Sequence, residues 1–99
     1  MADQVTKRDS EYLLRLYVAG DSRRCMRARK NLERICKDHF GDSYHLEVID
    51  IGQDPGAAEE ADILAVPTLV KAHPLPVRKV VGDLSRTDRV LEGLGIHPG

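Results

Sequence analysis

The chain has 99 residues, which is enough for one folded domain with a single core. Its 15 basic and 16 acidic residues give a net charge of −1, which argues against wholesale electrostatic binding to nucleic acid or to an acidic membrane. No apolar run approaches membrane-spanning length and no signal peptide opens the sequence, so the two cysteines indicate a reducing, cytoplasmic compartment. We expect residues 1–10 to be a flexible tail and residues 11–99 to form the domain.

The first predicted elements are a strand over Glu11–Ala19 and a helix over Ser22–His39. Apolar residues occupy both faces of the strand, as in a strand that is covered on both sides. In the helix, Ser22 is a good N-cap, and residues at helical spacing form one buried stripe. The expected stripe consists of Cys25, Ala28, Leu32, Ile35, Cys36 and His39.

A second strand is predicted over Tyr44–Ile51, followed by a loop over Gly52–Gly56 and a short helix over Ala57–Leu64. The expected inward face of the strand consists of Leu46, Val48 and one flank of Ile49 or Ile51. The loop contains Asp-Pro-Gly, which we interpret as a turn. The succession of strand, helix and strand favours a right-handed parallel crossover.

Three prolines punctuate the C-terminal half. Pro67 lacks an N–H and suits the first position of a third strand, while Pro74 and Pro76 form a stiff link to a fourth strand over Val77–Val81. Each of these prolines is a candidate for a cis peptide bond. Residues 85–88 (Ser-Arg-Thr-Asp) fit a capping box at the start of a last helix.

The order of these elements, βαβαββα, predicts an α/β domain with a four-stranded mixed sheet and helices on both faces. In the last helix, Val90, Leu91 and Leu94 are expected to face inward. Gly93 and Gly95 limit the length of that helix.

Several separated motifs carry a resemblance to a known family. They are LYVAG (Leu16–Gly20), VID (Val48–Asp50), ILAVPTL (Ile63–Leu69), PLPVR (Pro74–Arg78), and GDLS (Gly82–Ser85) with Val90-Leu91. In this order they resemble the KaiB family of circadian-clock proteins, from Leu13 to about Leu94. The chain also resembles, more broadly, the thioredoxin fold; VPTL alone would be weak, because many thioredoxin-like domains carry it.

The resemblance implies a protein without catalytic activity that binds a KaiC-type ring ATPase, with a KaiA-like protein or a sensor histidine kinase as a further partner. It also implies a metamorphic chain, with a thioredoxin-like form and a ground-state form, usually tetrameric, whose C-terminal half is rearranged. The β-branched residues of Val77–Val81 favour the first form, so we expect mainly a thioredoxin-like monomer. The candidates for fold exchange are Pro67, Pro74, Pro76, Gly93 and Gly95.

Basic residues recur on one side of the first predicted helix, at Arg23, Arg27, Lys30, Arg34 and Lys37. The window Ser22–Asp38 holds seven basic and two acidic residues, whereas Glu47–Asp62 holds six acidic and no basic residues. Two solvated faces are the simplest interpretation, and the resemblance adds a docking surface for KaiC. Its candidate residues are Arg23, Arg27, Lys30, Tyr44, Leu46, Glu47 and Arg78. Glu47 is a departure, because related sequences often have lysine there.

Thioredoxins carry Cys-x-x-Cys after the first strand, and here Ser22 stands in place of the attacking cysteine. Cys36 lies eleven residues after Cys25 on the same helix, too far for a bridge. We therefore interpret Cys25 as a small core residue. Two alternative functions remain open: a thioredoxin-like redox sensor or oxidoreductase that uses Cys25, and a KaiB-like adaptor in sensor-kinase or stress signalling.

The sequence carries no pattern typical of a metal or cofactor site. His39, His45, His73 and His97 are scattered, and no phosphate-binding glycine motif is present. The tyrosines do not interleave with the basic residues as a nucleic-acid stacking platform would. We therefore predict no metal, no cofactor and no nucleic-acid partner.

Overall fold

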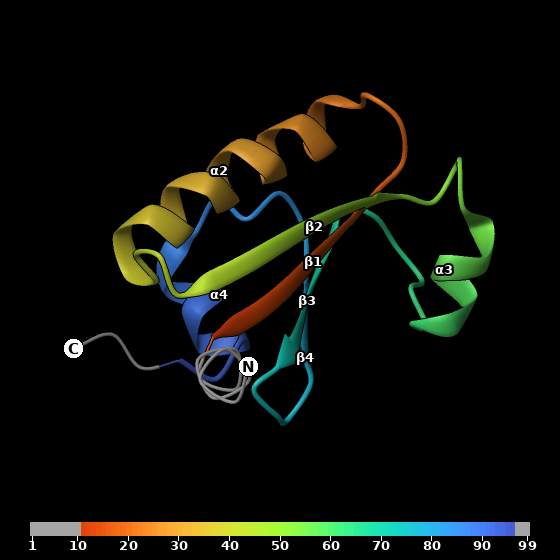
Figure 1. Cartoon of the computed structure of the whole chain (residues 1–99). Helices are drawn as coiled ribbons and strands as arrows, with labels where there is room; N and C mark the ends of the chain where they lie inside the picture. The colour runs from red at the N-terminus through yellow and green to blue at the C-terminus, as the bar shows by residue number, and fades with distance from the viewer. Residues whose placement is uncertain (1–10, 97–99) are drawn as a thin grey trace.

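The computed structural model describes residues 11–96, which form a four-stranded sheet with three helices (Figure 1). The elements are β1 (Tyr12–Val18), α2 (Arg23–His39), β2 (Tyr44–Asp50), α3 (Pro55–Glu60), β3 (Thr68–His73), β4 (Arg78–Val81) and α4 (Thr87–Gly93). The predicted order of elements and the fold class are confirmed. The predicted tail over residues 1–10 and His97 lie outside the described residues.

The strands lie in the order β2-β1-β3-β4. β1 pairs in parallel with β2, so that Leu16 faces Val48, and pairs antiparallel with β3, so that Leu16 also faces Leu69. β3 and β4 form an antiparallel pair. A parallel pair needs a long crossover, which α2 supplies, whereas the short segment between β3 and β4 is enough for an antiparallel pair.

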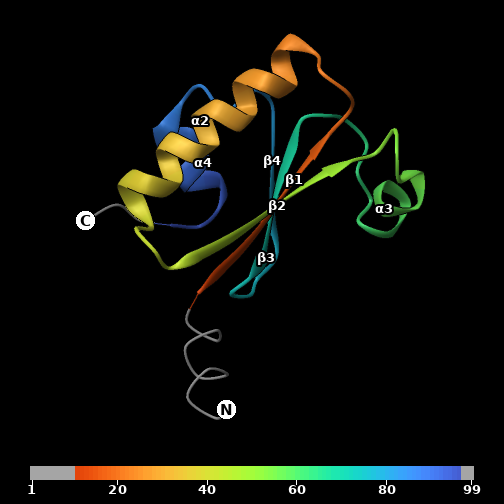
Figure 2. The same cartoon turned by 45° about the horizontal axis from the view of Figure 1, so that its top comes forward.

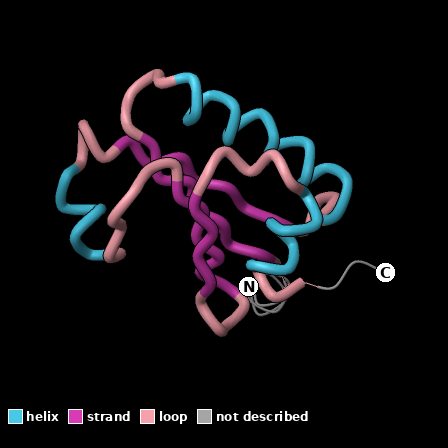
Figure 3. The backbone as a smooth tube through the Cα atoms, turned by 180° about the vertical axis from the view of Figure 1, so that it is seen from behind, coloured by secondary structure: helices cyan, strands magenta, loops and turns pink. Residues whose placement is uncertain are grey.

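The helices are divided between the two faces of this sheet. α2 and α4 lie on one side and α3 on the other (Figures 1 and 2), and the view from behind shows the same division (Figure 3). The core lies on the α2 and α4 side and includes Leu14, Leu32, Leu69 and Leu91. α3 has six residues, none of them buried. On the face of the sheet beside it, Tyr17 and Val70 are buried.

The amphipathic pattern of α2 is confirmed except at its C-terminal end. The Ser22 hydroxyl caps the helix by accepting a hydrogen bond of 3.2 Å from the Cys25 N–H. His39, predicted to be buried, is exposed. Phe40, directly after the helix, occupies the core instead, with its ring centroid 4.6 Å from that of Tyr12.

Val48 lies on the inward face of the second strand, as predicted, because it stands opposite Leu16 and two residues after Leu46. It is nevertheless 37% exposed, because β2 is the edge strand of the sheet.

The prediction for the neighbouring helix is wrong. The short helix spans Pro55–Glu60, earlier than predicted, since Asp54 caps it by accepting a hydrogen bond of 3.3 Å from the Ala57 N–H. The Asp-Pro-Gly sequence therefore begins a helix, with proline in the first turn, where its missing N–H carries no cost.

The predicted capping box before α4 does not form. Arg86, not Ser85, is the N-cap residue of the helix, and no side-chain cap bond is present there. The Ser85 N–H donates instead to a carboxylate oxygen of Asp83, at 3.1 Å. Between these residues Leu84 is buried with a φ of +62°, and this inward turn moves Ser85 away from the cap position.

The prolines of the C-terminal half frame β3. The peptide bonds before Pro67, Pro74 and Pro76 are all cis. β3 begins at Thr68, one residue later than Pro67, and the Thr68 hydroxyl donates a hydrogen bond to the Ala65 carbonyl. A role for these prolines in fold exchange stays a prediction.

Candidate partner-binding surface

The solvent side of α2 carries a line of basic side chains, which we term the basic face: Arg23, Arg27, Lys30, Arg34 and Lys37. All five residues are exposed. At about 3.6 residues per turn they lie opposite the buried stripe, because the same period sets both rows. Such a concentration of one sign of charge can steer a partner with an acidic surface.

The middle of α2 adjoins the loop between β4 and α4. Asn31 donates a side-chain hydrogen bond of 2.9 Å to the Asp83 carbonyl, which holds this loop against α2. The pKa of Asp83 is lowered, first by hydrogen bonds from Ser85 and then by the positive charges of Arg27 and Arg24. Among residues 11–96, the structure shows no ion pair for Lys30.

Tyr44 and Leu46 point to the α2 side of the sheet and are partly buried against the core. The rings of Tyr44 and Phe40 lie 6.3 Å apart, centroid to centroid. Tyr44 and Leu46, which were predicted to bind a partner, thus pack against the core beside α2, and only part of each side chain is accessible to a partner.

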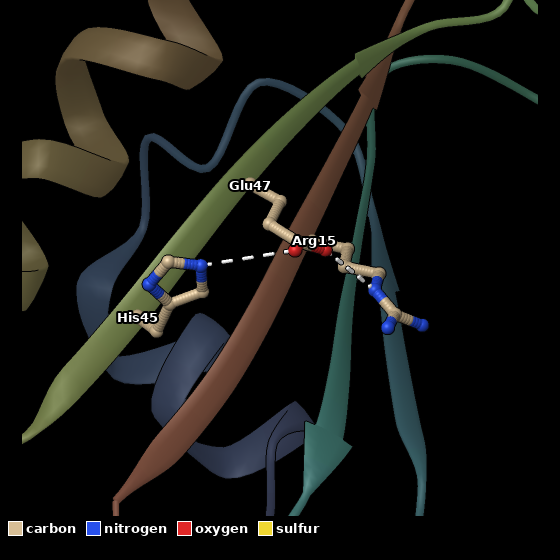
Figure 4. A network of polar contacts seen from close by, with 3 residues as sticks. All are labelled: Arg15, His45 and Glu47. Carbon is tan, nitrogen blue, oxygen red and sulfur yellow. Dashed lines mark hydrogen bonds and ion pairs between the residues drawn. The ribbon is translucent and has the colours of Figure 1, made fainter.

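Glu47 points to the opposite face of the sheet, where it joins a polar network (Figure 4). Arg15, its cross-strand neighbour, donates a hydrogen bond of 2.9 Å from Nε to Glu47 Oε1. His45 Nε2 lies 3.7 Å from Glu47 Oε2. The hydrogen bond that Arg15 donates to Glu47 raises the pKa of Arg15, against the opposing effect of burial.

An open groove of about 660 Å³ surrounds the Arg15–Glu47 pair. Its floor includes Tyr17, Ile49 and Val70 from the sheet, and α3 forms one wall. Lys79 closes the far side by donating hydrogen bonds from Nζ to the Ala61 and Asp62 carbonyls, at 2.6 and 3.3 Å. The groove therefore combines an apolar floor with charged walls.

Arg78 is exposed on β4, at the edge of the sheet opposite to β2. The seven predicted binding residues therefore do not form one surface. Arg23, Arg27 and Lys30 lie together on the basic face, Glu47 lies on the other side of the sheet, and Arg78 is at the far edge. The basic face is the part of the prediction that is displayed as a continuous surface.

Sequence reasoning passed over three residues: Arg15, which pairs with Glu47; Lys71, which is buried within β3; and Leu64, which is exposed. Arg15 and Lys71 are single charges within apolar strands, and that isolation is the signal that could have drawn attention to them. Leu64 is 98% exposed, and nothing in the sequence sets it apart from the buried leucines.

Both cysteines are free and buried on the inner side of α2. Burial raises the pKa of the Cys36 thiol to about 12. Cys25 is 3% exposed, so it is not presented at the helix N-terminus as an attacking thiol would be. Within residues 11–96, no three His, Cys, Asp or Glu side chains gather as metal ligands would, and no helix is long and apolar enough to cross a membrane.

The model of one protein family, described as the KaiB domain, matches residues 15–96. The chain belongs to the KaiB family. Among KaiB relatives, the circadian clock protein KaiB3 of Synechocystis sp. is 45% identical over 86 residues, which cover 87% of this chain and 84% of the relative. The circadian clock oscillator protein KaiB of Prochlorococcus marinus is 52% identical over 85 residues, or 86% of this chain and 75% of the relative.

Solved structures show that this KaiB-family chain has a thioredoxin-like fold. Mitochondrial thioredoxin 3 of Saccharomyces cerevisiae matches with a TM-score of 0.69 at 16% identity, over 95% of this chain and 86% of the other. The N-terminal domain of Synechococcus elongatus SasA matches with a TM-score of 0.72 at 19% identity, over 91% and 89%. At these identities the likeness concerns the fold alone.

Proposed function

We propose that this KaiB-family chain is a binding module without catalytic activity, which docks onto a KaiC-type ring ATPase. A KaiA-like protein or a sensor histidine kinase is the further partner that this role would involve. Relatives named as circadian clock proteins support the proposal, since their similarity extends over most of the chain.

The basic face of α2 is the observation that carries the docking proposal. Its five exposed cations run the length of the helix, while the acidic segment that includes Asp54 and Glu60 lies beyond the other face of the sheet. The two sets of charge are thus displayed on different sides of the protein. A partner with an acidic patch would gain affinity and association rate from the basic face at low salt.

The absence of catalysis is proposed from the thioredoxin-type position at the start of α2. Ser22 stands where an attacking cysteine would be, and its hydroxyl is used as the helix cap. Cys25 is buried, and Cys36 is held as a neutral thiol by its raised pKa. We expect insulin-reduction activity at background level, and unchanged partner binding in Cys25→Ser; dithiol turnover that this substitution abolishes would contradict the proposal.

The proposal also includes a cytoplasmic location and a mainly monomeric state. Two free cysteines suit a reducing compartment. We expect the thioredoxin-like form to be a monomer. Tetramers would form only in the ground-state fold. Sedimentation at low micromolar concentration tests this point, and a dominant tetramer would contradict it.

The docking surface is tested by charge reversal. Arg27→Glu with Lys30→Glu should weaken binding to the KaiC-type ATPase of the same organism about tenfold at low salt, because exposed pairs contribute only about 0.2–1 kcal/mol each and reversal adds repulsion. The matched control is Arg86→Glu with Arg89→Glu, which makes the same charge change at the N-cap and in the first turns of α4. Affinity is measured by biolayer interferometry at two salt concentrations.

Two outcomes distinguish the parts of this proposal. An unchanged affinity in the α2 double variant, with binding by the unmodified protein intact, would move the docking surface away from the basic face. A lack of any binding by the unmodified protein would overturn the assignment of the partner.

A further inference from the structure

β4 is the strand at the edge of the sheet opposite to β2, and part of its backbone faces away from the sheet. Among residues 11–96 its one neighbouring strand is β3, in antiparallel register. Pro67 stands opposite Gly82 in this register, and the Gly82 N–H donates a hydrogen bond of 3.0 Å to the Pro67 carbonyl. Bonded and non-bonded pairs alternate along an antiparallel ladder, so the even-numbered residues of β4 bond to β3. The N–H and C=O groups of Lys79 and Val81 therefore point outward.

This outer edge of β4 is left open by the described part of the chain. Across residues 11–96, no hydrogen bond of a turn or loop reaches the backbone of Lys79 or Val81. α4 packs against a face of β4 and not against its edge, since a Cβ atom at Gly93 would be 2.7 Å from the Val80 side chain. A row of N–H and C=O groups without strand partners on an edge strand is a template for a further strand.

Exposed apolar side chains gather along the same edge. Val81 is 62% exposed, and Val77, directly before the strand, is 51% exposed. Their side chains lie on the α3 side of the sheet, because Val77 and Lys79 line the groove there and Val81 alternates in step with them. Leu75, in the link between β3 and β4, is 75% exposed. Single exposed apolar residues are normal, but a group of them marks an interaction site.

The charges beside this edge are positive. Arg78 is exposed on the α4 side, and the structure shows no ion pair for it within residues 11–96. The ammonium of Lys79 is held by the carbonyls at the end of α3, so Arg78 is the cation that a partner would meet. Pairing of β4 with the β4 of a second copy would collect two cations from each copy on one short ladder, which is unfavourable. An acidic strand would instead bring opposite charges together.

We propose that the open edge of β4 binds an extended segment of a partner protein in which acidic and apolar residues alternate. The segment would add a strand to the sheet through backbone hydrogen bonds to Lys79 and Val81. Its apolar side chains would lie on the α3 side, against Val77 and Val81. Its acidic side chains would lie on the other side, where the guanidinium of Arg78 can hold both oxygens of a carboxylate. This surface is separate from the basic face, and the test below does not use the KaiC-type ATPase.

The experiment is an NMR titration and amide hydrogen exchange of the full chain with an acetylated and amidated heptapeptide of alternating valine and glutamate. We expect saturable binding and an alternating pattern of protection along β4. The amides of Arg78 and Val80 should be protected with and without peptide, because they bond to β3. Those of Lys79 and Val81 should become protected only with peptide, because they point outward. A peptide with lysine in place of glutamate should bind about fivefold more weakly.

Two substitutions separate the backbone contribution from the charge contribution. Val81→Pro removes one outward N–H and leaves the ladder with β3 intact, since proline is tolerated on an edge strand where its N–H would face solvent. We expect this variant to lose peptide binding. Arg78→Glu should reverse the preference between the two peptides, whereas the matched control Arg34→Glu, on the basic face, should leave that preference unchanged.

Four outcomes would overturn the proposal. They are a lack of saturable binding at millimolar peptide, binding that protects neither outward amide, unchanged affinity in a folded Val81→Pro variant, and an unchanged peptide preference in Arg78→Glu. If Val81→Pro does not fold, Val81→Glu takes its place, because it sets a carboxylate against the acidic segment and should weaken binding as well. Protection of the outward amides that grows with protein concentration in the absence of peptide would assign the edge to a second copy instead of an acidic partner.

Discussion

The side-chain amide of Asn31 donates a hydrogen bond of 2.9 Å to the carbonyl oxygen of Asp83, 52 positions later in the chain. This bond joins the middle of α2 to the loop that leads into α4. The loop has unusual backbone conformations, with φ of +122° at Gly82 and +62° at Leu84. Glycine adopts a positive φ readily but leucine does not, so Asn31 holds a loop whose conformation Leu84 disfavours.

We expect Asn31→Ala to lower the free energy of unfolding by about 1 kcal/mol, because the carbonyl of Asp83 loses its donor. Urea denaturation monitored by circular dichroism measures this change. Arg34→Ala, on the exposed basic face of the same helix, is the control and should stay within about 0.5 kcal/mol of the unmodified protein. Equal losses in both variants would show that the hydrogen bond adds nothing beyond helix propensity.

Gly93 allows α4 to approach β4. An alanine at this helical position would ordinarily gain up to about 1 kcal/mol, but its Cβ would lie 2.7 Å from Val80 Cγ2. Valine is stiff at χ1, so the strand must move, and overpacking of this kind costs about 1–3 kcal/mol. We expect Gly93→Ala to destabilise the protein, and to become neutral or stabilising in a Val80→Ala background. A double-mutant cycle without coupling between the two positions would contradict this account.

We expect the cross-strand ion pair of Arg15 and Glu47 to tolerate an exchange of the acidic and the basic residue between the two positions. Both side chains are part-exposed, at 38% and 43%, so the pair contributes only about 0.2–1 kcal/mol. Glu47→Lys places two cations side by side and should cost about 1 kcal/mol in urea denaturation. Adding Arg15→Glu should restore most of that loss, whereas Glu59→Lys, on the surface of α3, should have little effect.

We expect the free energy of unfolding to fall at alkaline pH because of Cys36. Its pKa is raised to about 12 by burial, whereas a cysteine in an unfolded chain titrates near about 8.5. Between these values the unfolded state loses the thiol proton and the folded state keeps it, so stability decreases by up to about 1.4 kcal/mol per pH unit. In Cys36→Ala the free energy of unfolding should therefore fall less steeply with pH than in Cys25→Ala, which retains Cys36. Parallel slopes in the two variants would exclude Cys36 as the cause.

The thioredoxin-like form should dominate in solution. NMR secondary shifts should be extended through Arg78–Val81 and helical through Thr87–Gly93, as these segments are here. The β-branched valines of the fourth strand favour this form, because they lose side-chain freedom in a helix. The reverse pattern in the major species, helical and then extended, would show that the ground-state form is preferred.

Local patterns were sufficient to predict the fold where an element carries a clear apolar pattern. Leu32 and Ile35 in α2 recur at the period of a helix, and Leu14 and Leu16 in β1 belong to a nearly continuous apolar run typical of a covered strand. All four are buried. Ser85 could not be placed in the same way. It resembles a helix cap, but the burial of Leu84 decides the path of the loop, and that depends on the whole core.

The candidate site likewise contains a part that local patterns predict and a part that depends on the tertiary structure. The basic face of α2 follows from helical period alone, so its residues were predictable. The contact of Glu47 with Arg15 depends on the register between two strands, which no local pattern specifies. Lys71 would ordinarily be assigned to solvent, yet the pairing with Leu14 turns it to the core face.

The lack of any buried residue in α3 has a consequence for motion. Opening of this helix would break the two hydrogen bonds from Lys79 at its C-terminal end, but it would take no side chain of the helix out of the core. The free energy of such local opening is therefore far below that of global unfolding, and its amides should exchange with deuterium well before those of β1 or α2. The opening would widen the groove beside the Arg15–Glu47 pair while leaving the core intact. The wall of the groove that α3 forms can thus move while the rest of the fold stays unchanged.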